Sequence, residues 1–129
     1  MADSDRRKRG EEMIKKVYAG DVVVPPQGAN AFTDLMLEQL FAETWTREAL
    51  SIRDRRLLLM GVIAALGEKD TWKIQVRSAL KNGELTEEQV HEITIMLAQY
   101  AGYPRAAGLL GPTYEAIQEA KGKTAQPDG

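Results

Sequence analysis

The chain has 129 residues, with 17 basic and 19 acidic side chains, one histidine and no cysteine. This length predicts a single folded domain. Without cysteine the protein cannot form disulfides, bind a metal through thiolates or carry out thiol redox chemistry, and a single histidine argues against an ordinary zinc site. The nearly balanced charge gives no sign of a nucleic-acid or membrane-surface binder.

The hydrophobic pattern predicts a protein without a membrane span or a secretory signal. The longest apolar run, residues 57–66, covers about ten residues, whereas a helix that crosses a bilayer needs roughly twenty. No apolar core follows the basic run at residues 6–9 near the N-terminus. The acidic neighbours of that run favour an exposed helix start over a nuclear-import patch. We therefore expect a cytoplasmic protein.

Helical periodicity extends through the chain and predicts an all-α fold, a single-domain bundle of about six helices. The first helix is expected at about residues 6–19. An extended connector containing Pro25-Pro26 and Gly28 follows, because these residues interrupt regular structure. Asn30 can cap a second helix that runs to about Trp45. The apolar residues expected on the inner side of this second helix are Phe32, Leu35, Met36, Leu40 and Phe41.

Four further helices are expected, at about residues 51–66, 70–82, 87–101 and 104–120. Ser51 with Asp54, and Thr86 with Gln89, have the spacing of capping pairs at the start of the first and third of these helices. The last helix should be interrupted at Gly111-Pro112.

The expected helices at residues 51–66 and 87–101 are apolar on more than one side. Such helices need cover on most sides, which the short helices of one chain do not easily provide, so this pattern predicts self-association. In terms of domains, we expect an N-terminal helix with its connector (1–29), a helical domain (30–121) and a disordered tail (122–129). In the expected helix at residues 87–101, the residues expected to share one apolar face are Val90, Ile93, Leu97 and Tyr100.

A tryptophan and four arginines, Trp45, Arg47, Arg53, Arg55 and Arg56, lie just before the apolar run at residues 57–66. Guanidinium groups at the entrance of a buried helix can bind an anion through paired hydrogen bonds. The alternative is that these arginines form a solvated first helical turn with a layer of surface ion pairs, which is the usual environment of charged side chains.

Three motifs follow one another along the chain: WTREALSIRDRRL at 45–57, VRSALKNGELTEEQVHE at 76–92 and YAGYP at 100–104. Together, over roughly residues 32–110, they resemble the carboxymuconolactone decarboxylase family. The resemblance implies an alkylhydroperoxidase-like, all-α subunit that assembles as a homotrimer or homohexamer. It also implies one of two chemistries: a cysteine-dependent peroxidase, or the decarboxylation of a carboxylated muconolactone, an intermediate of aromatic-acid breakdown.

The functional positions that the resemblance implies are only partly retained. The two thiol positions of the peroxidase branch fall near Glu68 and Thr71, which excludes thiol peroxidase chemistry. The histidine that both branches carry in the fourth helix is here Gln75, and a second histidine of the decarboxylases is here Met96. His91 matches neither position, and its acidic neighbours suit a solvent-facing side chain.

Loss of CO2 from a lactone acid needs an anchored carboxylate, a polarised carbonyl oxygen and a proton donor. Arginine and amide groups can supply the first two. A glutamine cannot transfer a proton, so the donor would be Glu68, Tyr100 or a water molecule. The residues expected to act in catalysis are Gln75, Glu68 and Arg55. Those expected to bind substrate are Trp45, Arg47, Arg53 and Tyr100.

We therefore expect a lyase that acts on a small carboxylated lactone or related anion from aromatic-compound breakdown, with no metal and no cofactor. The expected partners are that carboxylate and further copies of the same chain, with no nucleic acid and no membrane. The alternative is a catalytically silent relative that binds an anion or serves as an oligomeric scaffold. The missing histidines favour the scaffold, whereas the retained W-x-R and R-x-R motifs favour the enzyme.

Overall fold

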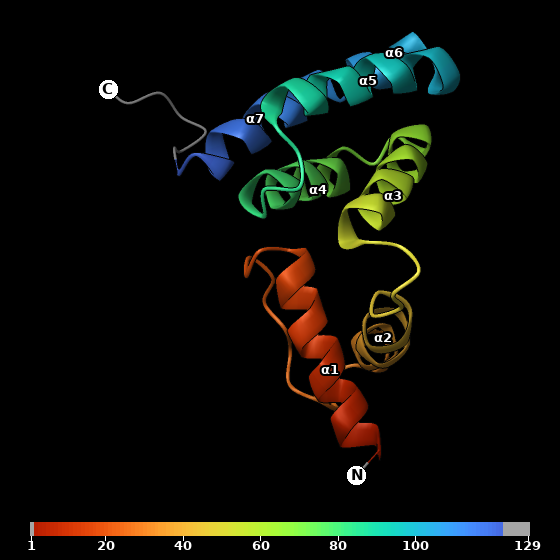
Figure 1. Cartoon of the computed structure of the whole chain (residues 1–129), viewed down its shortest axis with the longest axis vertical. Helices are drawn as coiled ribbons and strands as arrows, with labels where there is room; N and C mark the ends of the chain where they lie inside the picture. The colour runs from red at the N-terminus through yellow and green to blue at the C-terminus, as the bar shows by residue number, and fades with distance from the viewer. Residues whose placement is uncertain (1, 123–129) are drawn as a thin grey trace. The chain divides into compact units, whose positions relative to one another are not determined.

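The computed structural model describes residues 2–122, with side chains from Asp5 onward. All regular structure in these residues is helical (Figure 1), which confirms the all-α prediction. The chain divides into two compact units: unit 1 ends at Arg55 and unit 2 begins at Arg56. The elements, in chain order, are α1 (Ala2–Val17), α2 (Ala31–Leu35), the π-helix η1 (Met36–Thr44), α3 (Ile52–Leu66), α4 (Lys69–Lys81), α5 (Glu87–Ala101), α6 (Tyr103–Ala107) and α7 (Leu110–Ala120).

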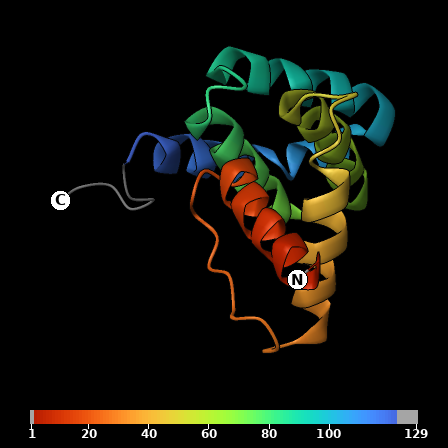
Figure 2. The same ribbon diagram turned by 60° about the horizontal axis from the view of Figure 1, so that its bottom comes forward.

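Unit 1 is built on the packing of α1 along η1 (Figure 2). Ile14 and Val17 on α1 and Leu37 on η1 are buried. The two helices approach each other closely at Gly10, where an added Cβ would lie only 2.1 Å from the carbonyl oxygen of Leu37. Glycine is needed at this position because no larger residue fits, although glycine weakens a helix interior.

The segment before η1 is held to α1 by the buried side chain of Arg7. Its guanidinium pairs with Asp34 and donates to the carbonyl oxygen of Pro25, so the buried charge is compensated. Asn30 caps α2 as predicted, since its side-chain oxygen accepts a hydrogen bond from the backbone N–H of Thr33 at 2.7 Å.

The inner side predicted for the second helix is largely wrong. Phe32 is 80% exposed and Leu35 and Leu40 are also exposed, whereas Leu37 is buried; Phe41 is buried as predicted. Phe32 and Leu35 lie in α2, before the π-helix, and nothing in the structure explains their exposure. For Leu40 the reason is the π-helical geometry of η1, in which backbone hydrogen bonds join each residue to the fifth one before it. This wider turn rotates the side chains out of the phase that an α-helical period gives.

The core of unit 2 surrounds Trp72 of α4, which is fully buried. Its indole Nε1 donates to Thr113 Oγ1 of α7 at 2.8 Å. This buried bond satisfies the indole N–H and fixes the register of α7 on α4, which lie against each other in Figure 2. The other buried members of this core are Met60, Ile63, Ala64, Val76, Ala79, Leu85, Val90, Leu109 and Ala116.

The capping pairs at Ser51 and Thr86 are confirmed. Ser51 Oγ accepts from the backbone N–H of Asp54 at 3.0 Å, and Thr86 with Gln89 forms a complete capping box. The predicted interruption at Gly111-Pro112 is wrong, because the chain breaks at Gly108 and Leu109 instead. Pro112 lies in the first turn of α7, where a missing backbone N–H costs no hydrogen bond.

Several apolar side chains of unit 2 face away from its core. On α3 these are Leu58, Val62 and Leu66, spaced one helical turn apart; on α5 they include Tyr100, which is 83% exposed. Tyr100, which the sequence groups with Val90 on one apolar face, is therefore not buried with it. No helix within residues 2–122 is long and apolar enough to cross a membrane. Beyond Gly122, the tail predicted to be disordered lies outside the described residues.

Candidate functional site

Four of the predicted site residues belong to the arginine segment, which we define as residues 45–55 of unit 1. Arg47 lies exposed in the loop after η1, and Arg53 lies exposed in the first turn of α3. Arg55, two residues further along α3 and half-buried, donates from Nη2 to the carbonyl oxygen of Arg47 at 2.9 Å. This bond closes the loop onto α3, so the backbone that carries the Arg47 guanidinium is held in place.

Trp45, at the start of the same segment, is buried. Its ring is stacked with Phe41 of η1, with ring centroids 6.1 Å apart and an interplanar angle of 7°. The stack anchors the loop to the helix that precedes it. The role of Trp45 as a pocket wall stays a prediction.

In unit 2, Gln75 is part of a buried polar cluster that also contains Arg56 and Glu84. Arg56 donates from Nε to Glu84 Oε1 at 3.0 Å and from Nη2 to Glu84 Oε2 at 2.9 Å, a bidentate pair. Its Nη1 donates to the side-chain oxygen of Gln75 at 2.7 Å. Arg56 is 0% and Gln75 is 1% exposed. Arg56 is therefore a buried arginine with hydrogen-bonded partners, whereas Arg47 and Arg53 are exposed.

The sequence pattern placed Arg56 in the arginine group but not among the predicted site residues, and it gave no indication of Glu84. Arg56 precedes the buried Met60 and Ile63 by four and seven residues and so lies on the same side of α3. The sequence alone does not single it out, because Arg53 and Arg55 are also followed by apolar residues at these spacings. A charge on that side must be paired. Removing only Glu84 would leave the guanidinium buried and uncompensated, at a cost of about 3–5 kcal/mol.

The two predicted proton donors, Glu68 and Tyr100, are both exposed side chains of unit 2. Glu68 stands at the start of α4, where it makes no side-chain cap hydrogen bond, and Tyr100 lies near the end of α5. His91 is partly buried beside the ring of Tyr114, with centroids 5.7 Å apart. The catalytic roles of Glu68 and Tyr100 stay predictions.

A second ionic group joins α4 to α7. Lys73 Nζ lies 2.7 Å from Glu119 Oε2 and 3.0 Å from Glu115 Oε2, and Arg77 also pairs with Glu119. Hydrogen bonds to Glu119 and then to Glu115 raise the pKa of Lys73. Burial pushes the pKa of Glu119 upward, but the hydrogen bonds from Lys73 and Arg77 outweigh it and leave that pKa below its ordinary value.

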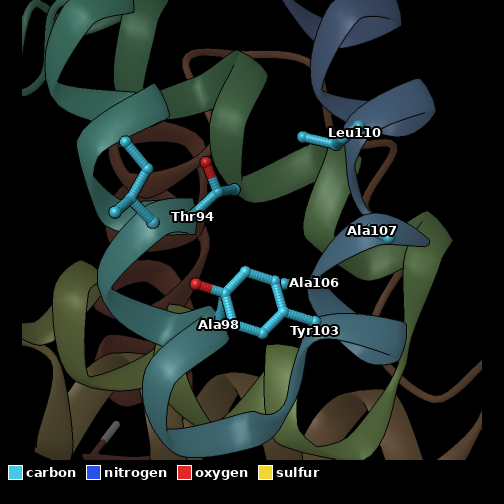
Figure 3. A pocket seen from close by; sticks show the side chains of 7 residues that line it. Thr94, Ala98, Tyr103, Ala106, Ala107 and Leu110 are labelled. Atoms are coloured by element: carbon cyan, nitrogen blue, oxygen red, sulfur yellow. The ribbon is translucent and has the colours of Figure 1, made fainter.

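A pocket of about 230 Å³ lies between α5, α6 and α7 (Figure 3). Its two polar side chains are already engaged: Thr94 donates to the carbonyl oxygen of His91 at 2.6 Å, and the Tyr103 hydroxyl accepts from Gln99 at 2.7 Å. With no cation in its lining, it does not suit a carboxylate, and it contains none of the predicted site residues. Its lining consists of Thr94, Ile95, Ala98, Tyr103, Ala106, Ala107 and Leu110.

The part of the chain that the structure describes contains no group of three or more histidine, cysteine, aspartate or glutamate side chains that could hold a metal ion. The candidate residues themselves carry guanidinium, amide, carboxyl, phenol and indole groups. These groups can anchor a carboxylate, donate hydrogen bonds to a developing oxyanion and, through a carboxyl or phenol, move a proton.

A family model described as the carboxymuconolactone decarboxylase family matches residues 30–115. The chain belongs to this family. A 4-carboxymuconolactone decarboxylase from Acinetobacter baylyi is 26% identical to it over 125 residues, which cover 92% of each protein. The resemblance inferred from the three motifs is thereby confirmed. The matched range contains both the arginine segment and the buried cluster of Arg56, Gln75 and Glu84. Membership of the family supports a decarboxylase-like function.

Proposed function

We propose that the protein is a decarboxylase-type lyase that acts on a small carboxylated lactone or a related anion. The observation that carries this proposal is the arginine segment, which lies within the range matched by the family model. Arg47 and Arg53 are exposed there, and Arg55 holds the backbone of Arg47 in place. Guanidinium groups on a fixed backbone suit a carboxylate, because the planar fork can form two parallel hydrogen bonds with it.

The remaining roles in this proposal go to residues that the sequence singles out. Gln75 would donate a hydrogen bond to the carbonyl oxygen that receives the electron pair when CO2 leaves. Glu68, Tyr100 or a water molecule would then protonate the resulting carbanion. The relative's name supports a lactone acid as substrate, and aromatic-compound breakdown as its source and a cytoplasmic location belong to the same proposal.

The direct test is release of CO2 from 4-carboxymuconolactone by the pure protein, together with calorimetric binding of small dicarboxylates. Arg47→Ala should abolish both signals. Arg9→Ala provides a matched control, because Arg9 is an exposed arginine of the same unit, and its ion pair is with the exposed Glu43. A parent protein that releases no CO2 from 4-carboxymuconolactone or from any of a set of other small carboxylated lactones would refute the decarboxylase proposal.

An anion-binding or oligomeric scaffold is the second candidate. It is favoured by the chemistry at position 75, where a glutamine that cannot transfer a proton accepts a hydrogen bond from Arg56. A scaffold of this kind would bind dicarboxylates but release no CO2, so the same two measurements separate the candidates.

Self-association as a homotrimer or homohexamer is part of both candidates. It is supported by the exposed apolar residues of α3, which are Leu58, Val62 and Leu66, and by Tyr100 on α5. Exposed apolar side chains that follow one another along one side of a helix are typical of an interaction surface. A second copy of the chain would remove these side chains from water.

A further inference from the structure

Another pocket of unit 2, of about 270 Å³, lies where the turn between α3 and α4 meets α6 and the break before α7. Two of its lining residues are cationic: Lys69, the first residue of α4, and Arg105 of α6. We propose that this pocket binds a phosphate group between Lys69 and Arg105. The site goes beyond the decarboxylase function proposed above and does not depend on it. Its lining consists of Gly67, Lys69, Pro104, Arg105, Gly108 and Leu109.

The two cations of the pocket are not neutralised within the chain. Among the residues that the structure describes, neither the Lys69 ammonium nor the Arg105 guanidinium forms a hydrogen bond or an ion pair. Glu68 and Asp70 are the acidic neighbours of Lys69 in the sequence, but they do not line the pocket. Two uncompensated positive charges in one pocket attract an anion. Other cations of unit 2 are instead paired with glutamates, and these are Lys73, Arg77 and Lys121.

Two glycines leave room for these cationic side chains. A Cβ added at Gly67 would lie 2.7 Å from Arg105 Nη1, and one added at Gly108 would lie 3.2 Å from Cε of Lys69. Gly67 ends α3 with a φ of +71°, which by itself favours glycine. Gly108 has a φ of −65°, which any residue can adopt, so its backbone does not require glycine. What Gly108 provides is the space beside the pocket that Lys69 occupies.

The combination of a lysine and an arginine suits a phosphate group better than a carboxylate. A phosphate monoester carries a charge of about −1.5 to −2 at pH 7 and has three acceptor oxygens. The lysine ammonium is a compact point charge and the guanidinium is a planar fork, so the two can bind different oxygens of one tetrahedral group. A carboxylate has a single charge and two oxygens in one plane, which one guanidinium already satisfies. Pro104 and Leu109 add apolar side chains to the lining, against which the organic part of a phosphate ester can pack.

The test is a titration of the full-length protein, followed through the NMR signals of its backbone amides. Inorganic phosphate and phenyl phosphate are the probes and succinate is the comparison, all at one low ionic strength because salt screens exposed charges. The amides of Gly67, Lys69 and Gly108 should shift and saturate at about millimolar phosphate. Tighter binding of phenyl phosphate would identify an ester as the ligand, and tighter binding of inorganic phosphate would identify free phosphate. Succinate that bound there as tightly as both phosphates would refute the assignment to phosphate.

Lys69→Ala and Arg105→Ala should each weaken phosphate binding about tenfold, because each removes a charge-assisted hydrogen bond. Both side chains are exposed, so both variants should fold. Lys121→Ala is the matched control, since Lys121 is an exposed lysine of the same unit that pairs with Glu87 outside the pocket. Its dissociation constant should stay within about twofold of the parent value. Gly108→Leu fills the pocket without a change of charge and should abolish the amide shifts, with circular dichroism to establish that it is folded.

Four results would overturn the inference. They are the absence of saturable shifts with both phosphates, an unchanged affinity in both Lys69→Ala and Arg105→Ala, full affinity in a folded Gly108→Leu, and an equally large loss in Lys121→Ala. The last result would mean that phosphate is attracted to the positive surface in general and not to this pocket. None of these measurements involves release of CO2, so the decarboxylase proposal is tested separately.

Discussion

Gly10→Ala tests the close approach of α1 and η1 in unit 1. The new Cβ would lie 2.1 Å from the carbonyl oxygen of Leu37 and 2.7 Å from its carbonyl carbon, whereas ordinary contact begins at 3.4 Å. These are backbone atoms, which cannot rotate away. To reach ordinary contact, the two helices would have to separate by about 1.3 Å, which is the difference between 3.4 Å and 2.1 Å. Such a shift loosens the packing of Ile14, Val17 and Leu37.

Two opposing terms set the expected magnitude. Overpacking of this kind costs about 1–3 kcal/mol, and the upper end applies because the obstacle is backbone. Alanine regains up to about 1 kcal/mol of helix propensity over glycine. We therefore expect a net loss of about 2 kcal/mol in the free energy of unfolding.

Urea unfolding followed by circular dichroism measures this loss as a lower midpoint at an unchanged slope. Gly111→Ala is the control, because Gly111 lies in α7 and an added Cβ there would have no atom within 4 Å. This variant should be as stable as the parent, or more stable by up to about 1 kcal/mol. If Gly10→Ala also matched or exceeded the parent, the close contact between α1 and η1 would be incorrect.

Four further predictions follow from the sequence and the contacts. Arg47→Lys should weaken the binding of small dicarboxylates by about 1.5–3 kcal/mol in calorimetry, since it loses the planar fork. Arg55→Lys should lose less because it keeps one donor for the Arg47 carbonyl, and equal losses in the two variants would place Arg55 on the ligand. With no cysteine, the pure protein should consume no hydroperoxide with any dithiol reductant, and reductant-dependent consumption would contradict this. Light scattering at micromolar concentration should give a homo-oligomer, and a mass of 14.3 kDa would rule it out. Because Lys73 and Arg77 lower the pKa of Glu119, this carboxylate stabilises the fold above the ordinary pKa of a glutamate and loses that contribution as the pH falls through its lowered value. Glu119→Gln should therefore lose less stability on acidification than the parent, and identical losses in urea unfolding would count against the ion pair.

Local chemistry determined the features that the sequence predicted correctly. The caps at Asn30, Ser51 and Thr86 depend on residues no more than three positions apart, so their spacing is visible without a fold. The motifs at residues 45–57, 76–92 and 100–104 were likewise enough to indicate the family that the comparison confirms. The absence of cysteine decided which of the family's two chemistries was excluded.

Long-range contacts decided the rest. Arg53, Arg55 and Arg56 are identical in type and lie within one turn, and nothing local tells which of them is buried. Arg56 is buried because the side of α3 that it shares with Met60 faces Glu84, 28 residues away. Arg56 also donates a hydrogen bond to the side-chain oxygen of Gln75, which lies 19 positions later in the chain. In η1 the close approach of α1 at Gly10 accompanies a π-helical turn, and this turn decides that Leu37 and not Leu40 is buried. A prediction from the sequence has to assume an α-helical period and cannot tell which distant residue a side chain will contact. The tertiary structure fixes both the period and the contact.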